Sequence, residues 1–398
     1  MIAALEPLKW LLAGVLALAL SACSINSTRG PDAGLGTDGS DSRLRATLPG
    51  VKIAMLLPLS GSGNAQQVAK ALKQAGELAL FEFDNTNVAL ATKDTRGTAD
   101  GAQAAAREAI AEGAELIIGP LFAAEVTAVA PIARQAGVPV IAFSSDRTVA
   151  GNGVYLLSFV AGSEVPRAIS YAASQGKRRF AALIPDSDFG RILEAAFQRS
   201  VQESGGVVVA AARYPADANG MLEPVKQIAA FAKKGEPPQI DAIFMPASQE
   251  ALQFLAPLMP YFEVDTQAVK LIGNSGWDFQ GTGKEKAMLG GWFAAPDPKG
   301  WQDFPRRYVE TYGDVPPRLA SLAYDAVSLA VSLSNNPRGR RFAQAELTRP
   351  SGFAGVDGLF RLRPDGLPER GFAILEVQRF GNQIIEPAPI AFTTTAQY

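Results

Sequence analysis

The sequence predicts an α/β protein of two lobes, each built around a mainly parallel sheet. Three observations lead to this fold class. Short apolar runs alternate with helical patterns, which is typical of strand–helix–strand units in a parallel sheet. The alternation restarts near residue 160, with no repeat at the level of sequence. The 398 residues, of which 47% are hydrophobic, suffice for about two domains with cores of their own.

The first series of strands is expected at five places: 51–57, 88–94, 114–120, 138–144 and 154–159. The run VKIAMLL (51–57) is almost wholly apolar, as expected for a strand that helices cover on both faces. Apolar residues from Val68 to Ala79 then repeat at helical spacing, which indicates a helix with one buried face. A later helix should end near Gln135, because a glycine, here Gly137, commonly closes a helix.

The second series of strands is expected at 179–185, 206–212, 241–246 and 269–274, with helices between them. After a strand-like run at 290–296, the order changes to two successive helices, at about 301–312 and 317–334. The runs 358–364 and 371–381 are then predicted to pair as antiparallel strands around the turn Pro364-Asp365-Gly366.

This change of order indicates that the chain crosses between the lobes more than once. We expect the first lobe to comprise residues 51–160 and 290–350. The second lobe is expected to comprise residues 161–289 and 351–398.

The composition excludes several classes of function. Histidine is absent and cysteine occurs once, at Cys23, so catalytic histidines, His or Cys metal sites, disulfides and a Cys–His nucleophile are excluded. The net charge of −2 gives no electrostatic basis for binding nucleic acid. We therefore expect a binding protein rather than an enzyme, with no metal, no cofactor and no nucleic-acid partner.

The N-terminus is typical of a targeting segment. Lys9 precedes an apolar stretch, Trp10 to Leu20, which is too short to span a membrane but fits the core of a signal peptide. The stretch ends in Leu20-Ser21-Ala22-Cys23, which resembles the bacterial lipobox. The alternative is an ordinary signal peptide with a chance cysteine. The resemblance implies that residues 1–22 are removed and that Cys23 is acylated, which would bind the protein to a membrane.

Residues 23–50 carry this cysteine and are rich in Gly, Ser, Asp and Thr, so we expect a flexible tether between the lipid and the lobes. Ser24, rather than an aspartate, follows the cysteine. In lipoproteins of Gram-negative bacteria this pattern implies the outer membrane rather than the inner one. The expected location is therefore the periplasm.

A glycine-rich loop, PLSGSGN (58–64), follows the first expected strand. It lacks the third glycine of a dinucleotide fingerprint, since position 66 is Gln66, and it lacks the Gly-Lys-Ser/Thr of a phosphate loop. In open α/β sheets, ligands bind beyond the carboxyl ends of the strands, so Ser60 and Gly61 are candidate ligand contacts. A plain connection between strand and helix is the alternative.

The segment FSSDR (143–147) closes the fourth expected strand at the same edge of the sheet. It offers the hydroxyls of Ser144 and Ser145 and the carboxylate of Asp146 as candidate ligand contacts. The alternative is a helix N-cap, because Ser and Asp are preferred there.

Three further loops follow strands of the second series. In PDSDFG (185–190), the two aspartates are expected to be caps or solvated charges. Gln249 in PASQE (246–250) and Trp277 in SGWDF (275–279) are candidates to line a ligand cleft. Packing between the lobes is the alternative for Trp277.

Several segments in order resemble the type 1 periplasmic binding proteins of the leucine-binding-protein superfamily. They are IAMLLPLSGSG, DTRGTADGAQAAAREAIAEGAELIIGP, VAPIARQAGVPVIAFSSD, PDSDFG, LASLAYDAVSLA and GVDGLFRLRPDG, within about residues 51–390. The resemblance implies two Rossmann-like lobes joined by a multi-strand hinge, which close over a ligand.

The family's amino-acid clamp is incomplete here. The position of the family's carboxylate-binding serine is Ala123, and its later Ser/Thr position matches Ser145 or Asp146. The aromatic residue of the family matches Phe189. No acid clearly matches the residue that binds the amino group, and Gln249 is among the nearest.

Together with the lipobox, the segments LLPLSG, DTRG, GPLF and FSSD are most similar to the penicillin-binding-protein activator lipoproteins. That branch implies a peptidoglycan synthase as partner and a role in cell-wall synthesis. The alternative is the substrate-binding protein of an ABC importer, with an ABC permease as partner and a small amino-acid-like ligand such as a branched-chain amino acid.

Overall fold

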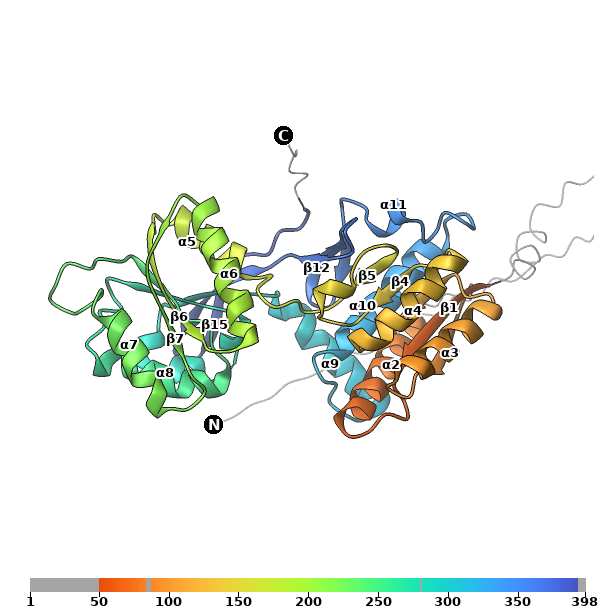
Figure 1. Ribbon diagram of the computed structural model, residues 1–398, viewed down its shortest axis with the longest axis horizontal. Coiled ribbons are helices and arrows are strands. Elements are labelled where there is room, and N and C mark those ends of the chain that lie inside the picture. The colour runs from red at the N-terminus through yellow and green to blue at the C-terminus, as the bar shows by residue number, and fades with distance from the viewer. Residues whose placement is uncertain (1–49, 84–86, 280, 393–398) are drawn as a thin grey trace, which may run out of the picture. The chain divides into compact units, whose positions relative to one another are not determined.

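The computed structural model describes residues 50–83, 87–279 and 281–392 (Figure 1). The predictions on the signal peptide, Cys23 and the tether lie outside these residues and stay predictions. Within the described part of the chain, no helix is long and apolar enough to cross a membrane.

The first sheet has five strands in the order β2-β1-β3-β4-β5, and all of its pairs are parallel. The strands are β1 (Val51–Leu57), β2 (Val88–Asp94), β3 (Leu116–Ile118), β4 (Val140–Ala142) and β5 (Val154–Leu156). Every residue of β1 except Lys52 is buried, because helices cover both faces of the sheet. The predicted parallel sheet is confirmed.

The helices between these strands are α2 (Asn64–Glu82), α3 (Ala99–Ala111), α4 (Ala123–Ala136) and the single turn η1 (Arg147–Val149). The predicted buried face of α2 is confirmed, since Leu72, Ala75 and Ala79 are fully buried. Gly137 closes α4 as expected: its φ of 68° is left-handed, and its N–H bonds the last turn of the helix.

The second sheet has seven strands in the order β15-β14-β10-β9-β8-β6-β7. Its parallel strands are β6 (Arg179–Pro185), β7 (Val207–Tyr214), β8 (Ala242–Phe244), β9 (Lys270–Gly273) and β10 (Trp292–Ala295). Two antiparallel strands, β14 (Ala373–Gln378) and β15 (Gly381–Glu386), complete one edge. The helices beside this sheet are α5 (Val165–Ser174), α6 (Asp188–Glu203), α7 (Leu222–Ala229) and α8 (Gln249–Tyr261), with short turns η2 (Asn219–Met221), η3 (Ser275–Trp277), η4 (Thr282–Lys284) and η5 (Lys286–Met288).

After β10 the chain returns to the first core. Two long helices, α9 (Pro298–Tyr312) and α10 (Ala320–Ser334), pack beside α2. A hydrogen bond of 2.7 Å from Tyr308 Oη to Gln74 Oε1 joins α9 to α2. A short helix, α11 (Gln344–Leu347), leads into a three-stranded sheet of β11 (Phe353–Gly355), β12 (Gly358–Leu362) and β13 (Pro368–Arg370).

One predicted strand pair is wrong. The turn at Pro364-Asp365-Gly366 is present, but β12 pairs with β13 at residues 368–370 and not with the run 371–381. That run contains β14, which pairs with β10 and β15 in the second sheet. Four of the six residues of β14 are buried. A position inside the second sheet, where side chains are covered on both faces, therefore stabilises this strand.

The two lobes are joined by three crossings of the chain: residues 157–164 (first crossing), 296–297 (second crossing) and 371–372 (third crossing). Sheet membership shifts two of the expected lobe boundaries. β10 lies in the second sheet, although residues 290–350 are expected in the first lobe. β11 to β13 pack on the first core through Phe353 and Phe360, although residues 351–398 are expected in the second. Two α/β lobes with mainly parallel sheets nevertheless agree with the predicted fold class.

Candidate functional site

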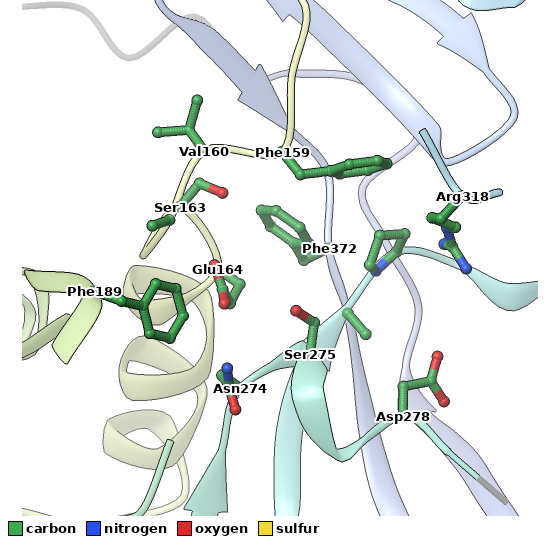
Figure 2. Close-up of a pocket in the computed structure, with 13 residues that line it drawn as sticks. Phe159, Val160, Ser163, Glu164, Phe189, Asn274, Ser275, Asp278, Arg318 and Phe372 are labelled. Carbon is green, nitrogen blue, oxygen red and sulfur yellow. The ribbon is translucent and has the colours of Figure 1, made fainter. Parts of the chain in front are cut away.

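A cavity of about 330 Å³ lies where the three crossings meet, and we call it the hinge cavity (Figure 2). All three crossings contribute to its wall. Residues that follow strands of the second sheet, and one residue before α10, complete it. The lining residues are Phe159, Val160, Ala161, Ser163, Glu164, Phe189, Asn274, Ser275, Asp278, Ala295, Pro296, Arg318 and Phe372.

Glu164 is the buried carboxylate of this cavity. Only 7% of the residue is exposed, and it stands at the N-cap position of α5. Its side chain makes no capping hydrogen bond, although an N-cap side chain commonly accepts one from the first N–H groups of the helix. Burial raises the pKa of Glu164 above its ordinary value, and only a hydrogen bond from its own backbone opposes the shift.

The loop after β9 holds three lining residues in place. Asn274 is almost fully buried, and its side-chain oxygen accepts a hydrogen bond of 3.1 Å from the backbone N–H of Ala247. Trp277 anchors the loop from inside, since its indole N–H donates to the Met245 carbonyl at 3.2 Å. Gly273 permits this packing, because a Cβ there would lie about 2.1 Å from the indole ring. The loop thereby presents Ser275 and Asp278 to the cavity (Figure 2).

Arg318 lines the cavity from the first lobe. Its guanidinium forms an ion pair with the fully buried carboxylate of Asp357, which also accepts a hydrogen bond of 2.6 Å from Ser321 Oγ. The guanidinium stacks on Trp301 with its central carbon 4.4 Å from the ring centroid. Arg318 is therefore fixed in position, and its charge is balanced from within the first lobe.

A second cavity, of about 650 Å³, lies at the carboxyl ends of β3 and β4, and we call it the first-lobe cavity. Its lining residues are Asn64, Ala65, Val68, Leu121, Phe122, Ala123, Phe143, Ser144, Ser145, Asp146, Ser158, Phe159 and Leu319. Because Phe159 belongs to the walls of both cavities, the two spaces are neighbours across the first crossing.

The polar groups of the first-lobe cavity bond one another. Ser144 Oγ accepts a hydrogen bond of 3.2 Å from the backbone N–H of Asp146. Asp146 caps η1 by accepting from the Thr148 N–H at 2.9 Å and from its hydroxyl at 2.7 Å. These bonds, that of the Thr148 side chain above all, hold the pKa of Asp146 below its usual value. The helix cap considered as an alternative from the sequence is therefore present, on residues that also line a cavity.

The predicted contacts fall in several places. Ser144, Ser145 and Asp146 line the first-lobe cavity, and Phe189 lines the hinge cavity. Gln249 lines a third cavity, of about 500 Å³, beside η4 and η5.

Three of the predicted contacts line none of these three cavities. Ser60 and Gly61 form a closed turn, in which the Ser60 N–H donates to Asp94 and the Gly61 N–H donates to the Pro58 carbonyl. Trp277 is fully buried in the core of the second lobe, so its ring supports the hinge cavity from behind.

Sequence reasoning missed most of the hinge cavity, including Phe159, Glu164, Asp278, Arg318 and Phe372. Their positions lie in connections and loops, where no periodic pattern marks them. One signal was present in the sequence: Glu164 precedes the Val-Pro that opens α5, and glutamate is not among the residues preferred at an N-cap. Among the described residues, no group of three or more acidic or cysteine side chains is placed to hold a metal ion.

Comparison with known proteins gives the same fold. Residues 50–382 match the model of a family described as periplasmic binding protein. A comparison with curated protein sequences finds no significant match.

Three solved structures illustrate the similarity. A protein of Rhodospirillum rubrum assigned to a branched-chain amino acid ABC transporter has 18% identity and a TM-score of 0.70, covering 84% of this chain and all (100%) of its own. An ABC transporter substrate-binding protein of Sphaerobacter thermophilus has 22% identity and a TM-score of 0.63, over 86% and 98% of the two chains. A solute-binding protein of an ABC transporter from Rhodopseudomonas palustris, in complex with 3,4-dihydroxy benzoic acid, has 19% identity and a TM-score of 0.58, over 88% and 100%.

Proposed function

This chain belongs to the periplasmic binding protein family, and from that premise we propose that it binds a small molecule in the hinge cavity as the substrate-binding protein of an ABC transporter. The family implies a periplasmic or extracellular protein. The proposal includes acylation at Cys23, which would hold the protein at a membrane surface.

The observation that carries this proposal is the make-up of the hinge cavity. All three crossings contribute residues to its wall. The second lobe contributes Ser275, and the first lobe contributes Arg318. A molecule bound there would contact each segment that joins the lobes. The cavity volume of about 330 Å³ lies within the usual range for small-molecule sites, and its wall combines aromatic side chains with a few polar groups.

The compared structures favour the importer over the penicillin-binding-protein activator. All three are described as ABC transporter proteins, and none as a partner of a cell-wall synthase. An activator would act through its outer surface and would need no ligand. Crosslinking in cells that captures a peptidoglycan synthase in high yield, together with an empty cavity, would reverse this preference.

A thermal-shift screen tests the proposal. The panel contains amino acids, organic amines and aromatic acids, each added to the purified protein at increasing concentration. A ligand at one hundred times its Kd adds about 2.7 kcal/mol to the free energy of unfolding, which raises the Tm by several degrees. A Tm that stays constant across the whole panel contradicts a small-molecule function.

A further inference from the structure

The strands of the first sheet are parallel, so they all begin at one end of the first lobe, which we call the amino end. The chain enters the described structure there, at Gly50, directly before β1. The N–H of Val51 donates to the Asn87 carbonyl at 2.6 Å, and the N–H of Glu115 donates to the Lys52 carbonyl at 2.8 Å. The residues that precede β2 and β3 therefore lie beside this entry point.

Two phenylalanine side chains are exposed at the amino end, and we call them the exposed phenylalanines. Phe81 lies in the last turn of α2 and is 77% exposed, and Phe83, which ends the helix, is 49% exposed. A phenylalanine side chain is stabilised when it leaves water for an apolar environment. Aromatic side chains of this kind enter the boundary between the headgroups and acyl chains of a lipid bilayer.

An arginine-rich segment, PRGRR (337–341), follows α10 at the same end, and we call it the arginine loop. Arg338 Nε lies 4.0 Å from Glu115 Oε1, which places the loop beside the turn before β3. The side chains of Arg338 and Arg340 are 73% and 76% exposed, whereas those of their acidic neighbours, Glu115 and Glu346, are much less exposed. Ion pairs of this length at a surface contribute little, so both guanidinium groups stay available to an external anion.

We propose that the amino end of the first lobe lies on the surface of an anionic membrane, with the exposed phenylalanines in the lipid interface and the arginine loop on the lipid phosphates. Arginine binds phosphate through paired N–H donors, and a cationic patch adds to the hold of a lipid anchor. The chain that follows Cys23 enters the described structure at this same end. The inference goes beyond the proposed function and rests only on its proposal of acylation at Cys23. In this orientation the first-lobe cavity, at the carboxyl ends of the strands, faces away from the membrane.

Tryptophan fluorescence in vesicles tests this contact on the protein as it is isolated from membranes. Phe83→Trp places a reporter at the amino end, and Phe254→Trp is the matched control on α8 of the second lobe, because Phe254 is 51% exposed. Each protein is reconstituted into vesicles of phosphatidylglycerol or of phosphatidylcholine that contain brominated lipids, and its quenching is measured relative to the wild type. In phosphatidylglycerol we expect quenching at residue 83 to be at least about threefold that at residue 254.

Charge reversal separates the arginine loop from the lipid anchor. Arg338→Glu combined with Arg340→Glu, in the Phe83→Trp protein, should lower the quenching to the level of the control position, because each arginine near an anionic surface adds to the attraction. The same double reversal at two exposed arginines of α6, Arg191 and Arg199, should leave the quenching unchanged.

Three results overturn the inference. The first is equal quenching at residues 83 and 254, and the second is quenching at residue 83 that is as strong in phosphatidylcholine as in phosphatidylglycerol. The third is an unmodified Cys23 in mass spectrometry of the isolated protein. None of these results affects binding in the hinge cavity, which the thermal-shift screen tests separately.

Discussion

The first-lobe cavity and the hinge cavity differ in how their polar groups are satisfied. In the first-lobe cavity, Ser144 and Asp146 are bonded to neighbours within four residues, and Asp146 is exposed. In the hinge cavity, Glu164 is buried and, among the residues that the structure describes, bonds only to its own backbone. The first arrangement is stable without a ligand, whereas the second leaves a buried carboxyl group with no partner beyond its own backbone among the described residues.

This difference shows that the type of residue is a poor guide to a binding site. Hydroxyls and a carboxylate at the end of a strand form a helix cap here, as such residues often do. Glu164, in the first crossing, makes no such cap with its side chain. We therefore place the proposed ligand beside the unsatisfied group rather than beside the polar cluster.

Filling each cavity with a large side chain should give the largest difference in ligand affinity between the two cavities. Ser275→Trp places a large ring in the hinge cavity from an exposed loop position, so we expect ligand affinity to fall by about 100-fold or more. Ser145→Trp does the same in the first-lobe cavity, where we expect a loss of no more than about tenfold. Calorimetry with the best ligand from the thermal-shift screen measures both. The reverse order of effects would move the ligand to the first-lobe cavity.

The pH dependence of stability should separate the two carboxylates. The raised pKa of Glu164 gives the ligand-free protein stability that is complete below the ordinary value of 4.5 and is lost as the pH rises through the folded-state pKa. Glu164→Gln should therefore become more stable relative to the wild type as the pH rises from about 5 to about 8. Thermal unfolding at several pH values measures this difference.

Asp146 is the reference for that series. Its pKa is lowered from 3.8, so its contribution is complete above that value and is lost only as the pH falls through the lowered pKa. The difference in Tm between Asp146→Asn and the wild type should be constant over the same range. A constant difference for Glu164→Gln as well would mean that Glu164 is not desolvated in solution.

The smallest effect is expected from removing the cap itself. Asp146→Ala loses both bonds to Thr148, and the capped turn has only three residues, so the Tm should fall by no more than a few degrees. Thr148→Val removes only the hydroxyl bond and should give a smaller shift. Affinity for the ligand should stay within about twofold of the wild type, since neither change reaches the hinge cavity.

The parallel sheets were predictable because their strands need burial on both faces. This need for burial is visible locally in the sequence, as the consecutive apolar residues of β1 and as the apolar residues that recur at helical spacing in α2. The pairing of β12 was not predictable in the same way. Its partner β13 has only three residues and contains Pro368 and Arg370, so it lacks the alternation that marks a strand.

Most of the hinge cavity was hidden for a different reason. Glu164, Ser275, Arg318 and Phe372 come from four distant segments, and only the three crossings bring them together. Trp277 shows the converse error: an aromatic residue after a strand suggested a ligand contact, yet its ring is used for core packing. Local sequence indicates where strands end, but it does not show which side chains remain unpartnered there.

The packing of α2 against α10 also affects the order in which the chain can fold. These helices lie side by side in the first core, while the strands and helices from α5 to β10 are synthesised between them. The first sheet therefore cannot complete its cover until almost all of the second lobe has been made, and contacts over such a separation form slowly. A chain with this delay stays incompletely folded for longer during synthesis, and it exposes apolar surface during that time.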